Sequence, residues 1–203
     1  MFEFSHDALD KICVEQKIDL WGIAPTALLN DEVAFLEKWL SEGKHGDMHW
    51  LEDHLELRRN PAEMFAGTQS ILMIGISYYS AETEIEQEAG NNSCRVAKYV
   101  TKVDYHHYLK KLLYSILKEL QKINPDTEGR PFTDSAPVME KVWAQKAGLG
   151  WIGKNSLLIN KRFGSYVFLG GLMLNCTFDS YDKQEKNNCG SCNACQNNCP
   201  TNA

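Results

Sequence analysis

The sequence lacks any apolar run long enough to cross a membrane as a helix. Such a helix needs roughly 20 consecutive apolar residues, whereas the apolar stretches here have the length of single strands. The first residues, MFEFSHDALDK, also lack the basic region and apolar stretch of a signal peptide. We therefore expect a cytoplasmic protein with no membrane partner.

Basic charge is also scarce. The chain carries 21 lysines and arginines against 27 aspartates and glutamates, which gives a formal net charge of −6. Neutralising phosphates requires clustered basic residues, so the chain as a whole is not built to coat nucleic acid. The net charge does not exclude a local cluster of basic residues on one face of the protein.

Paired cysteines of the kind that staple secreted domains are missing. Of the seven cysteines, three are scattered (Cys13, Cys94 and Cys176) and four are clustered near residue 190. An odd, scattered set argues against a disulfide framework and favours a reducing compartment. There the clustered thiols act as metal ligands and the isolated ones as buried apolar residues.

The chain does contain enough apolar residues, 43% of 203, for one substantial core with a short appendage. Its hydrophobic patterns predict a fold of the α/β class, an α+β sandwich with a mixed sheet flanked by helices. Helices are predicted at 5–17, 30–46, 104–123 and 138–148; strands at 19–25, 70–79 and 132–134; and a hairpin of strands at 156–160 and 165–174. Residues 80–93 read as a surface loop. We expect one domain at 1–175, a linker at 176–188 and a cysteine module at 189–203.

The cysteine module reads C-x2-C-x2-C-x3-C-P, with Cys189, Cys192, Cys195 and Cys199 before Pro200. This is the bacterial ferredoxin spacing, in which three thiolates hold one 4Fe–4S cluster and the fourth reaches a second cluster. A structural zinc site is the alternative, but it usually takes two cysteine pairs with a longer gap. No second cysteine run is present, so we expect this sequence to be the front part of a longer protein, its module truncated.

A glycine-rich stretch, GLGWIGKN at 148–155, nearly matches the phosphate-binding P-loop pattern. Asn155 stands where that loop needs a hydroxyl group, and the stretch follows a helix rather than a strand, so we reject nucleoside triphosphate binding. It is either a plain helix end and turn, or a loop that brings Lys154 and Asn155 to a large polar cofactor.

Asp134 lies at the end of a predicted strand, just before a helix. It could cap that helix or donate a proton at the carboxyl edge of a sheet, where ligands collect in α/β proteins. The capping interpretation applies more strongly to Asp104, at the start of the helix predicted at 104–123. His106 and His107 are adjacent and so do not form a metal-binding pair. Arg58 could end a solvated helix or contact a ligand.

Four segments in order carry a family resemblance: DYHHYLKKLL (104–113), FTDSAPVMEKVWAQKAGLGWIGKNSLLIN (132–160), GSYVFLGGLML (164–174) and the cysteine run. Together they closely resemble the epoxyqueuosine reductases, cobalamin- and iron–sulfur-dependent enzymes of queuosine biosynthesis in bacteria. The resemblance spans nearly the whole chain. It implies a cobalamin domain of flavin-reductase-like type at 1–175, related to cobalamin-processing and reductive-dehalogenase proteins.

The resemblance also implies an activity: reduction of an epoxide on the wobble base of tRNA to give queuosine and water, with electrons passing from two 4Fe–4S clusters to cobalamin. Asp134 matches the family's proton donor, Arg58 a cobalamin-contacting arginine, and Lys154 and Asn155 a loop facing the corrin. The implied partners are a tRNA bearing the queuosine precursor and an external electron donor, and we expect a monomer. The chemistry is coherent, because epoxide opening needs a strong reductant at carbon and a proton at the leaving oxygen.

The sequence departs from the family in two places. YVTKVDYH stands where members often read Y-A-x-G-x-D-Y-H. The second cysteine run and the C-terminal region that grips tRNA are absent, so tRNA binding by this chain alone is not implied. Two alternatives remain open: a reductive dehalogenase-like or cobalamin-processing enzyme acting on a small molecule, and a non-enzymatic iron–sulfur electron carrier.

Overall fold

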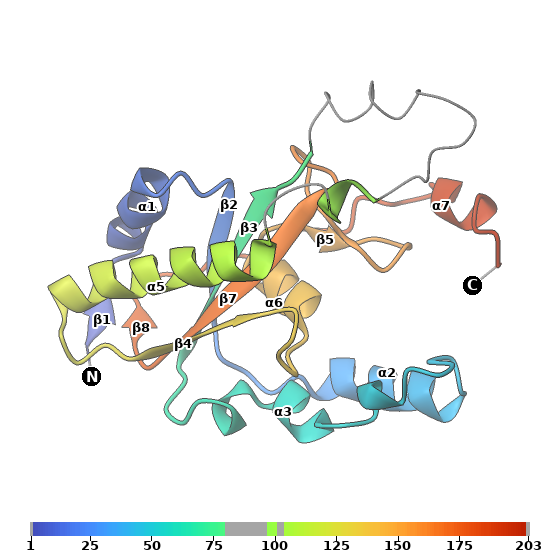
Figure 1. Ribbon diagram of the computed structural model, residues 1–203, viewed down its shortest axis with the longest axis horizontal. Helices are drawn as coiled ribbons and strands as arrows, with labels where there is room; N and C mark the ends of the chain where they lie inside the picture. Colours follow the sequence, from blue (N-terminus) through green and yellow to red (C-terminus); the bar gives the residue numbers. More distant parts are fainter. Residues whose placement is uncertain (1, 80–96, 101–103, 202–203) are drawn as a thin grey trace.

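The computed structural model describes residues 2–79, 97–100 and 104–201 (Figure 1). The surface loop predicted at 80–93 lies outside these residues. The predicted fold class is confirmed, since a central sheet is covered by helices on both faces. Among the described residues, none of the helices combines the length and the apolar character that crossing a bilayer requires.

The central sheet has four strands in the order β2-β3-β7-β4, and every neighbouring pair is antiparallel. Their bounds are Leu20–Pro25 for β2, Ser70–Ser77 for β3, Val167–Leu174 for β7 and Gly129–Thr133 for β4. The two inner strands, β3 and β7, are the longest of the four. A mixed sheet was predicted; here the parallel pairing occurs in a separate two-stranded sheet, β1 with β8.

The strand β3 is apolar at nearly every position because both faces of the sheet are buried. Leu72 and Ile74 point into one core cluster, and Ile71 and Met73 point into the other. This alternation follows from the two-residue period of a strand. The continuous apolar run therefore forms a buried strand, as predicted, and this strand lies at the centre of the sheet.

Helices cover both faces of the sheet (Figure 1). The first face carries α1 (His6–Glu15) and α5 (Tyr105–Ile123), whose buried leucines and isoleucines complete one core. The second carries α6 (Glu140–Lys146) with α2 (Asn30–Ser41) and α3 (Leu55–Arg59) beyond it. Short 3-10 helices lie at His49–Leu51 (η1), Pro61–Glu63 (η2) and Lys98–Val100 (η4).

The predicted hairpin of strands at 156–160 and 165–174 is wrong. Residues Leu158–Ile159 (β6) pair instead with Trp151–Ile152 (β5), in a two-stranded antiparallel sheet. The strand β7 already has β3 on one side and β4 on the other, so it has no free edge for β6. Only an isolated bridge between Asn160 and Gly164 remains at the turn.

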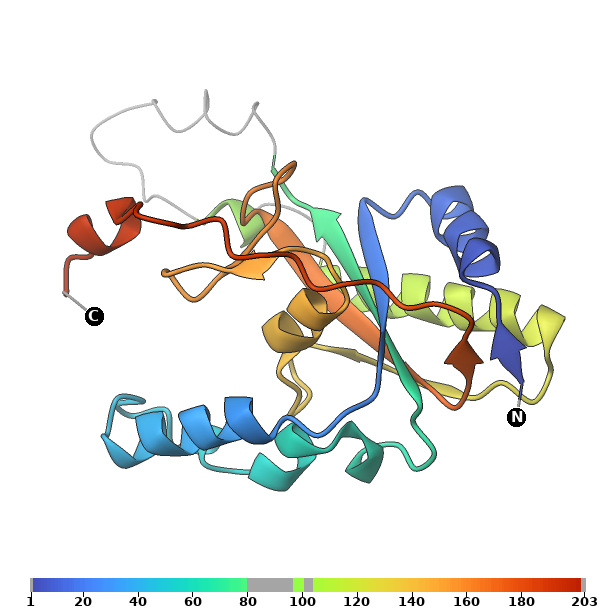
Figure 2. The ribbon, with the colours of Figure 1, turned by 180° about the vertical axis from the view of Figure 1, so that it is seen from behind.

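The segment predicted as a linker is partly fixed to the domain. Its first residues, Thr177–Phe178, form β8 and pair in parallel with Glu3–Phe4 (β1). Asp182 then accepts a hydrogen bond from the backbone N–H of Ile23 at 2.8 Å. Figure 2 shows the chain running from β8 across the domain to the short helix α7 (Ala194–Asn197) in the cysteine module.

Candidate active site

Asp134 stands directly after β4, at the point where the chain leaves the central sheet. Its side chain is 69% exposed, so solvent reaches the carboxylate. The following helix, α6, begins at Glu140, and Met139 is its N-cap residue. The capping interpretation of Asp134 is therefore wrong for this helix.

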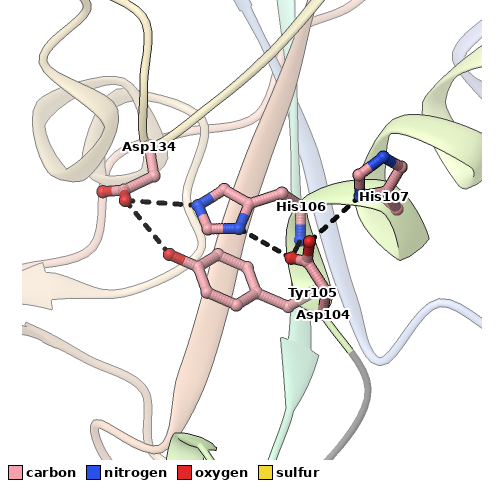
Figure 3. A network of polar contacts seen from close by, with 5 residues as sticks. All are labelled: Asp104, Tyr105, His106, His107 and Asp134. Carbon is pink, nitrogen blue, oxygen red and sulfur yellow. Dashed lines mark hydrogen bonds and ion pairs between the residues drawn. The ribbon is translucent and has the colours of Figure 1, made fainter.

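Two side chains from the start of α5 reach the same oxygen of Asp134 (Figure 3). The hydroxyl group of Tyr105 donates a hydrogen bond to Asp134 Oδ2 at 3.2 Å. The Nε2 atom of His106 lies 3.4 Å from that oxygen. These contacts join two segments that are far apart in the sequence, and they place proton-bearing groups beside the carboxylate.

The His106 ring lies between two acids. Its Nδ1 atom is 2.8 Å from Asp104 Oδ1, while Nε2 faces Asp134. A carboxylate only accepts hydrogen bonds, so the ring can donate to two ionised acids only as an imidazolium. The hydrogen bond with Asp104, followed by the contact with Asp134, raises the pKa of His106. The arrangement thus favours a protonated histidine next to Asp134.

Asp104 caps α5, as the sequence predicted. Its side chain accepts a hydrogen bond from the backbone N–H of His106 at 3.0 Å. Hydrogen bonds from the rings of His106 and His107 lower its pKa to about 2. Both histidines therefore contact one carboxylate, and Asp104 fixes the position of the His106 ring.

Tyr105 is held as a neutral phenol. Its ring stacks on Phe168 of β7, with centroids 4.1 Å apart and an interplanar angle of 4°. Burial, together with the charge of Asp134, raises its pKa to about 12. The hydroxyl group therefore keeps its proton at neutral pH and remains a hydrogen-bond donor to Asp134.

The two neighbouring arginines of α3 differ in their surroundings. Arg59 forms ion pairs with Glu37 at 3.0 Å and with Glu56 at 3.5 Å. Arg58 is half-buried, and its Nε atom is buried with no hydrogen-bond partner among the described residues. A half-buried guanidinium with a free donor suits a polar ligand, so Arg58 remains a candidate for cofactor binding.

Glu140, which no sequence pattern singled out, is a half-buried acid of this region. Burial, with the nearby charge of Asp134 adding to it, raises its pKa to about 7, while Arg58 acts in the opposite direction. Its Oε1 atom is buried with no hydrogen-bond partner among the described residues. The only sequence signal was a second acid six residues after Asp134, because the burial arises from tertiary packing.

The hairpin β5–β6 places Lys154 and Asn155 in its turn. Lys154 Nζ donates to the carbonyl oxygens of Gly190 at 3.0 Å and Cys192 at 2.9 Å, and to Asn193 Oδ1 at 2.7 Å. Asn155 Oδ1 accepts from the backbone N–H of Leu157 at 3.2 Å. Lys154 thus fastens the cysteine module to the hairpin, and corrin contact by these two residues stays a prediction.

The cysteine module presents four thiols that form no disulfide. The backbone N–H of Lys154, with the charge of that residue adding to it, lowers the pKa of Cys189, which favours the thiolate that metal ligation requires. A single zinc ion would hold four sulfurs about 3.8 Å apart. Among the described residues, the one group of three or more ligand atoms within 4.8 Å of one another contains no cysteine. The preference for a 4Fe–4S cluster over zinc stays a prediction from the cysteine spacing.

The two isolated cysteines within the described residues behave as the sequence predicted. Cys13 and Cys176 are both buried in the core that faces α1 and α5. Burial raises the pKa of each thiol, to about 12 for Cys176. They are unreactive apolar residues of the core. Cys94 lies outside the described residues.

Comparisons with known proteins agree on one family of similar proteins. Residues 58–135, which run from Arg58 to just past Asp134, match the family model described as "Epoxyqueuosine reductase QueG, DUF1730". The epoxyqueuosine reductase of Cyclobacterium marinum is 40% identical over 91% of this chain and 59% of its own length. That of Leadbetterella byssophila is 37% identical over 93% of this chain and 61% of its own length. The chain thus spans about six-tenths of the length of these curated relatives.

Solved structures agree in fold. The epoxyqueuosine reductase of Streptococcus thermophilus superposes with a TM-score of 0.80 at 25% identity, covering 96% of this chain and 52% of that one. An epoxyqueuosine reductase with a modified tRNA stem loop gives 0.82 at 23% identity, covering 97% and 52%. A reductive dehalogenase described as B12-dependent gives 0.60 at 12% identity, covering 96% and 24%. In its sequence matches and its fold, the chain corresponds to the N-terminal part of the epoxyqueuosine reductases.

Proposed function

We propose that this chain is the catalytic part of an enzyme that reduces epoxyqueuosine to queuosine at the wobble position of tRNA. The observation that carries the proposal is the contact of Asp134 with two proton-bearing groups, Tyr105 and His106, at the edge of the central sheet. The names of the relatives support the reaction, and the solved relative with an epoxyqueuosine-modified stem loop supports tRNA as the substrate. The proposed setting is cytoplasmic, with a monomeric protein and an external electron donor.

We assign the cofactor positions from this chain's own residues. Arg58, Lys154 and Asn155 would contact cobalamin, because Arg58 has a free donor and the other two lie in an exposed turn. The B12-dependent dehalogenase with the same fold supports that cofactor. Cys189, Cys192 and Cys195 would hold one 4Fe–4S cluster, and Cys199 would ligate a second. When bound, cobalamin supplies a strong two-electron reductant, for which low-potential clusters are a source of electrons.

The residues of the chain itself supply and position the protons that the reaction needs. Converting an epoxide to an alkene takes two electrons, and the oxygen leaves as water with two protons. In our proposal Asp134 relays the proton of the His106 imidazolium to the oxygen as the carbon–oxygen bond breaks. Water, which reaches the exposed Asp134 carboxylate, supplies the second proton. Tyr105 keeps its own proton and positions the carboxyl group.

The test is the substitution Asp134→Asn in a protein that contains this chain and the remainder found in its longer relatives. We expect cobalamin and iron contents to be unchanged. Turnover of an anticodon stem loop bearing epoxyqueuosine should fall on the order of 100- to 10,000-fold, the usual contribution of a general acid. His107→Gln is the matched control, since His107 contacts Asp104 but not Asp134. Near-normal turnover in Asp134→Asn with both cofactors bound would remove Asp134 from the reaction.

A small-molecule substrate is the second candidate function, favoured by the fold shared with the dehalogenase. The same assay separates the two. Turnover of the stem loop supports the tRNA reaction. A holoprotein that leaves it unchanged but removes halogen from an aryl halide supports the alternative. A redox-active holoprotein inert toward both would be an electron carrier.

A further inference from the structure

Three side chains with metal-binding groups meet in the segment that joins α2 to α3, and none of them belongs to the site described above. His45, His49 and Glu52 follow one another at intervals of four and three residues. Residues at these intervals share one side of a helical turn. The backbone forms such turns here. Met48 N–H donates a hydrogen bond to the His45 carbonyl oxygen at 3.1 Å, and the 3-10 helix η1 begins at His49.

The ligand atoms of this group are close to the spacing that a bound cation would impose. Glu52 Oε1 lies 2.9 Å from His45 Nε2 and 3.2 Å from His49 Nδ1. All three ligand atoms lie within 4.8 Å of one another. A tetrahedral zinc ion, with bonds of about 2.0–2.2 Å, holds neighbouring nitrogen and oxygen ligands about 3.3–3.5 Å apart. Only small side-chain movements would convert these contacts into metal bonds.

The group has one buried anchor and two accessible ligands. The His45 side chain is only 9% exposed and packs against Trp39, whereas His49 and Glu52 are 74% and 52% exposed. Among the described residues, Nδ1 of His45 has no hydrogen-bond partner, so the ring's polar contact there is with Glu52. A ring fixed by packing and aimed at an exposed carboxylate is preorganised for a cation that enters from solvent.

We propose that His45, His49 and Glu52 form a metal site for a divalent transition-metal cation of the zinc class, with a fourth position open to water. Imidazole nitrogens suit Zn²⁺, Ni²⁺ and Cu²⁺, and the set of two histidines and one carboxylate leaves an open position. The bound ion would join the turn after α2 to the segment entering α3. It would thereby restrict the motion of α3, the helix that carries Arg58 six residues after Glu52.

The test is a zinc titration of the 203-residue chain with Cys189→Ser, Cys192→Ser, Cys195→Ser and Cys199→Ser, so that the thiols of the cysteine module do not compete for zinc. Isothermal titration calorimetry gives the affinity, and NMR of the histidine rings reports the site. We expect one tight site and shifts of the ring signals of His45 and His49 together. His49→Gln and Glu52→Gln should each weaken binding at least ~10-fold, since even the loss of an indirect partner of a metal ligand costs that much.

The matched control is His54→Asn, which removes an exposed histidine from the same segment without touching the group; asparagine tolerates its left-handed backbone, φ 61°. Both test residues are exposed, and circular dichroism should show that their variants fold. Equal zinc affinity in wild type and His49→Gln would overturn the proposal. So would zinc binding that leaves the rings of His45 and His49 unchanged.

Discussion

At the scale of single residues, the central feature is a histidine shared by two acids. Asp104 is fixed by its capping role, so it sets the place of His106, and His106 in turn faces Asp134. A proton on this ring is stabilised from both sides. The consequence can be measured without any cofactor or substrate.

The first prediction concerns the titration of His106. Its pKa should lie above that of an ordinary histidine, so the ring keeps its proton as the pH rises past the usual range and loses it only at higher pH. Asp104→Asn should lower this pKa more than Asp134→Asn, because the hydrogen bond to Asp104 is the larger cause. NMR of the ring Cε1 proton against pH gives both values. An unchanged pKa in Asp104→Asn would contradict the assignment.

The second prediction concerns Glu140 and stability. The folded chain keeps its proton up to about pH 7, whereas the unfolded chain loses it near 4.5. Unfolding therefore releases a proton between these values, and the free energy of unfolding from this group falls as the pH rises from 4.5 to about 7. The loss is on the order of 3 kcal/mol.

Glu140→Gln should remove this pH dependence and be more stable than wild type at about pH 8. Urea unfolding followed by circular dichroism at about pH 5 and about pH 8 measures it. Glu128→Gln, which changes an exposed glutamate, is the control. If wild type and Glu140→Gln show the same pH dependence, the buried acid does not titrate as described.

Sequence alone could identify Asp134 but not its surroundings. The position of an aspartate between a strand and a helix is a local pattern, and it drew attention to the residue. The partners Tyr105 and His106 lie 29 and 28 residues earlier, and their contact with Asp134 exists only because α5 packs across β4 and β7. The burial of Glu140 and the meeting of His45 with Glu52 are likewise products of packing.

At the scale of elements, close contact between α6 and β2 holds the helix that follows the Asp134 loop. Gly22 lies in β2, and a Cβ atom there would stand 1.9 Å from the carbonyl oxygen of Ala147. A backbone oxygen cannot swing aside as a side chain can. Gly22 is therefore a packing residue that lets α6 approach the sheet.

The third prediction follows from this contact. Gly22→Ala should push α6 away from β2 and lower the free energy of unfolding by roughly 1–3 kcal/mol, the usual cost of overpacking. Gly170→Ala is the matched control: its nearest new neighbour is a leucine methyl group of Leu113 at 3.3 Å, so it should change stability by under ~1 kcal/mol. Urea unfolding compares the two. Equal stability of the two variants would refute the packing role.

The elements themselves were largely predictable because their patterns are local. The helix at 104–123 and the buried strand at 70–79 were predicted from periodicity and are found as α5 and β3. Strand pairing is not local. The pattern of Leu158–Ile159 identifies a strand, but only the full sheet shows that β7 has both edges occupied and that β6 must pair with β5.

At the scale of the whole molecule, the cysteine module is joined to the domain by a small number of polar contacts. Its side chains are largely exposed, and its helix α7 buries no residue. Besides the bonds of Lys154, Asn187 Nδ2 donates to the carbonyl oxygen of Ile152 at 3.3 Å. Since the apolar core contributes little here, the hydrogen bonds of Lys154 decide how firmly the thiols are held near the β5–β6 hairpin.

The last prediction tests that role. Lys154→Gln should loosen the module and speed amide hydrogen exchange in residues 189–193, roughly five- to thirty-fold, because losing charged hydrogen bonds costs roughly 1–2 kcal/mol. Lys141→Gln is the matched control, since Lys141 donates to the Ser156 carbonyl oxygen of the same hairpin at 2.7 Å but not to the module. Exchange followed by mass spectrometry on the iron-free chain needs no cofactor.

The positive charge of Lys154 also stabilises the reduced, more negative state of a nearby cluster. The reduction potential of a reconstituted cluster should therefore become more negative in Lys154→Gln and stay unchanged in Lys141→Gln. Exchange rates and potentials that agree between the two variants would show that the module is held by contacts other than Lys154.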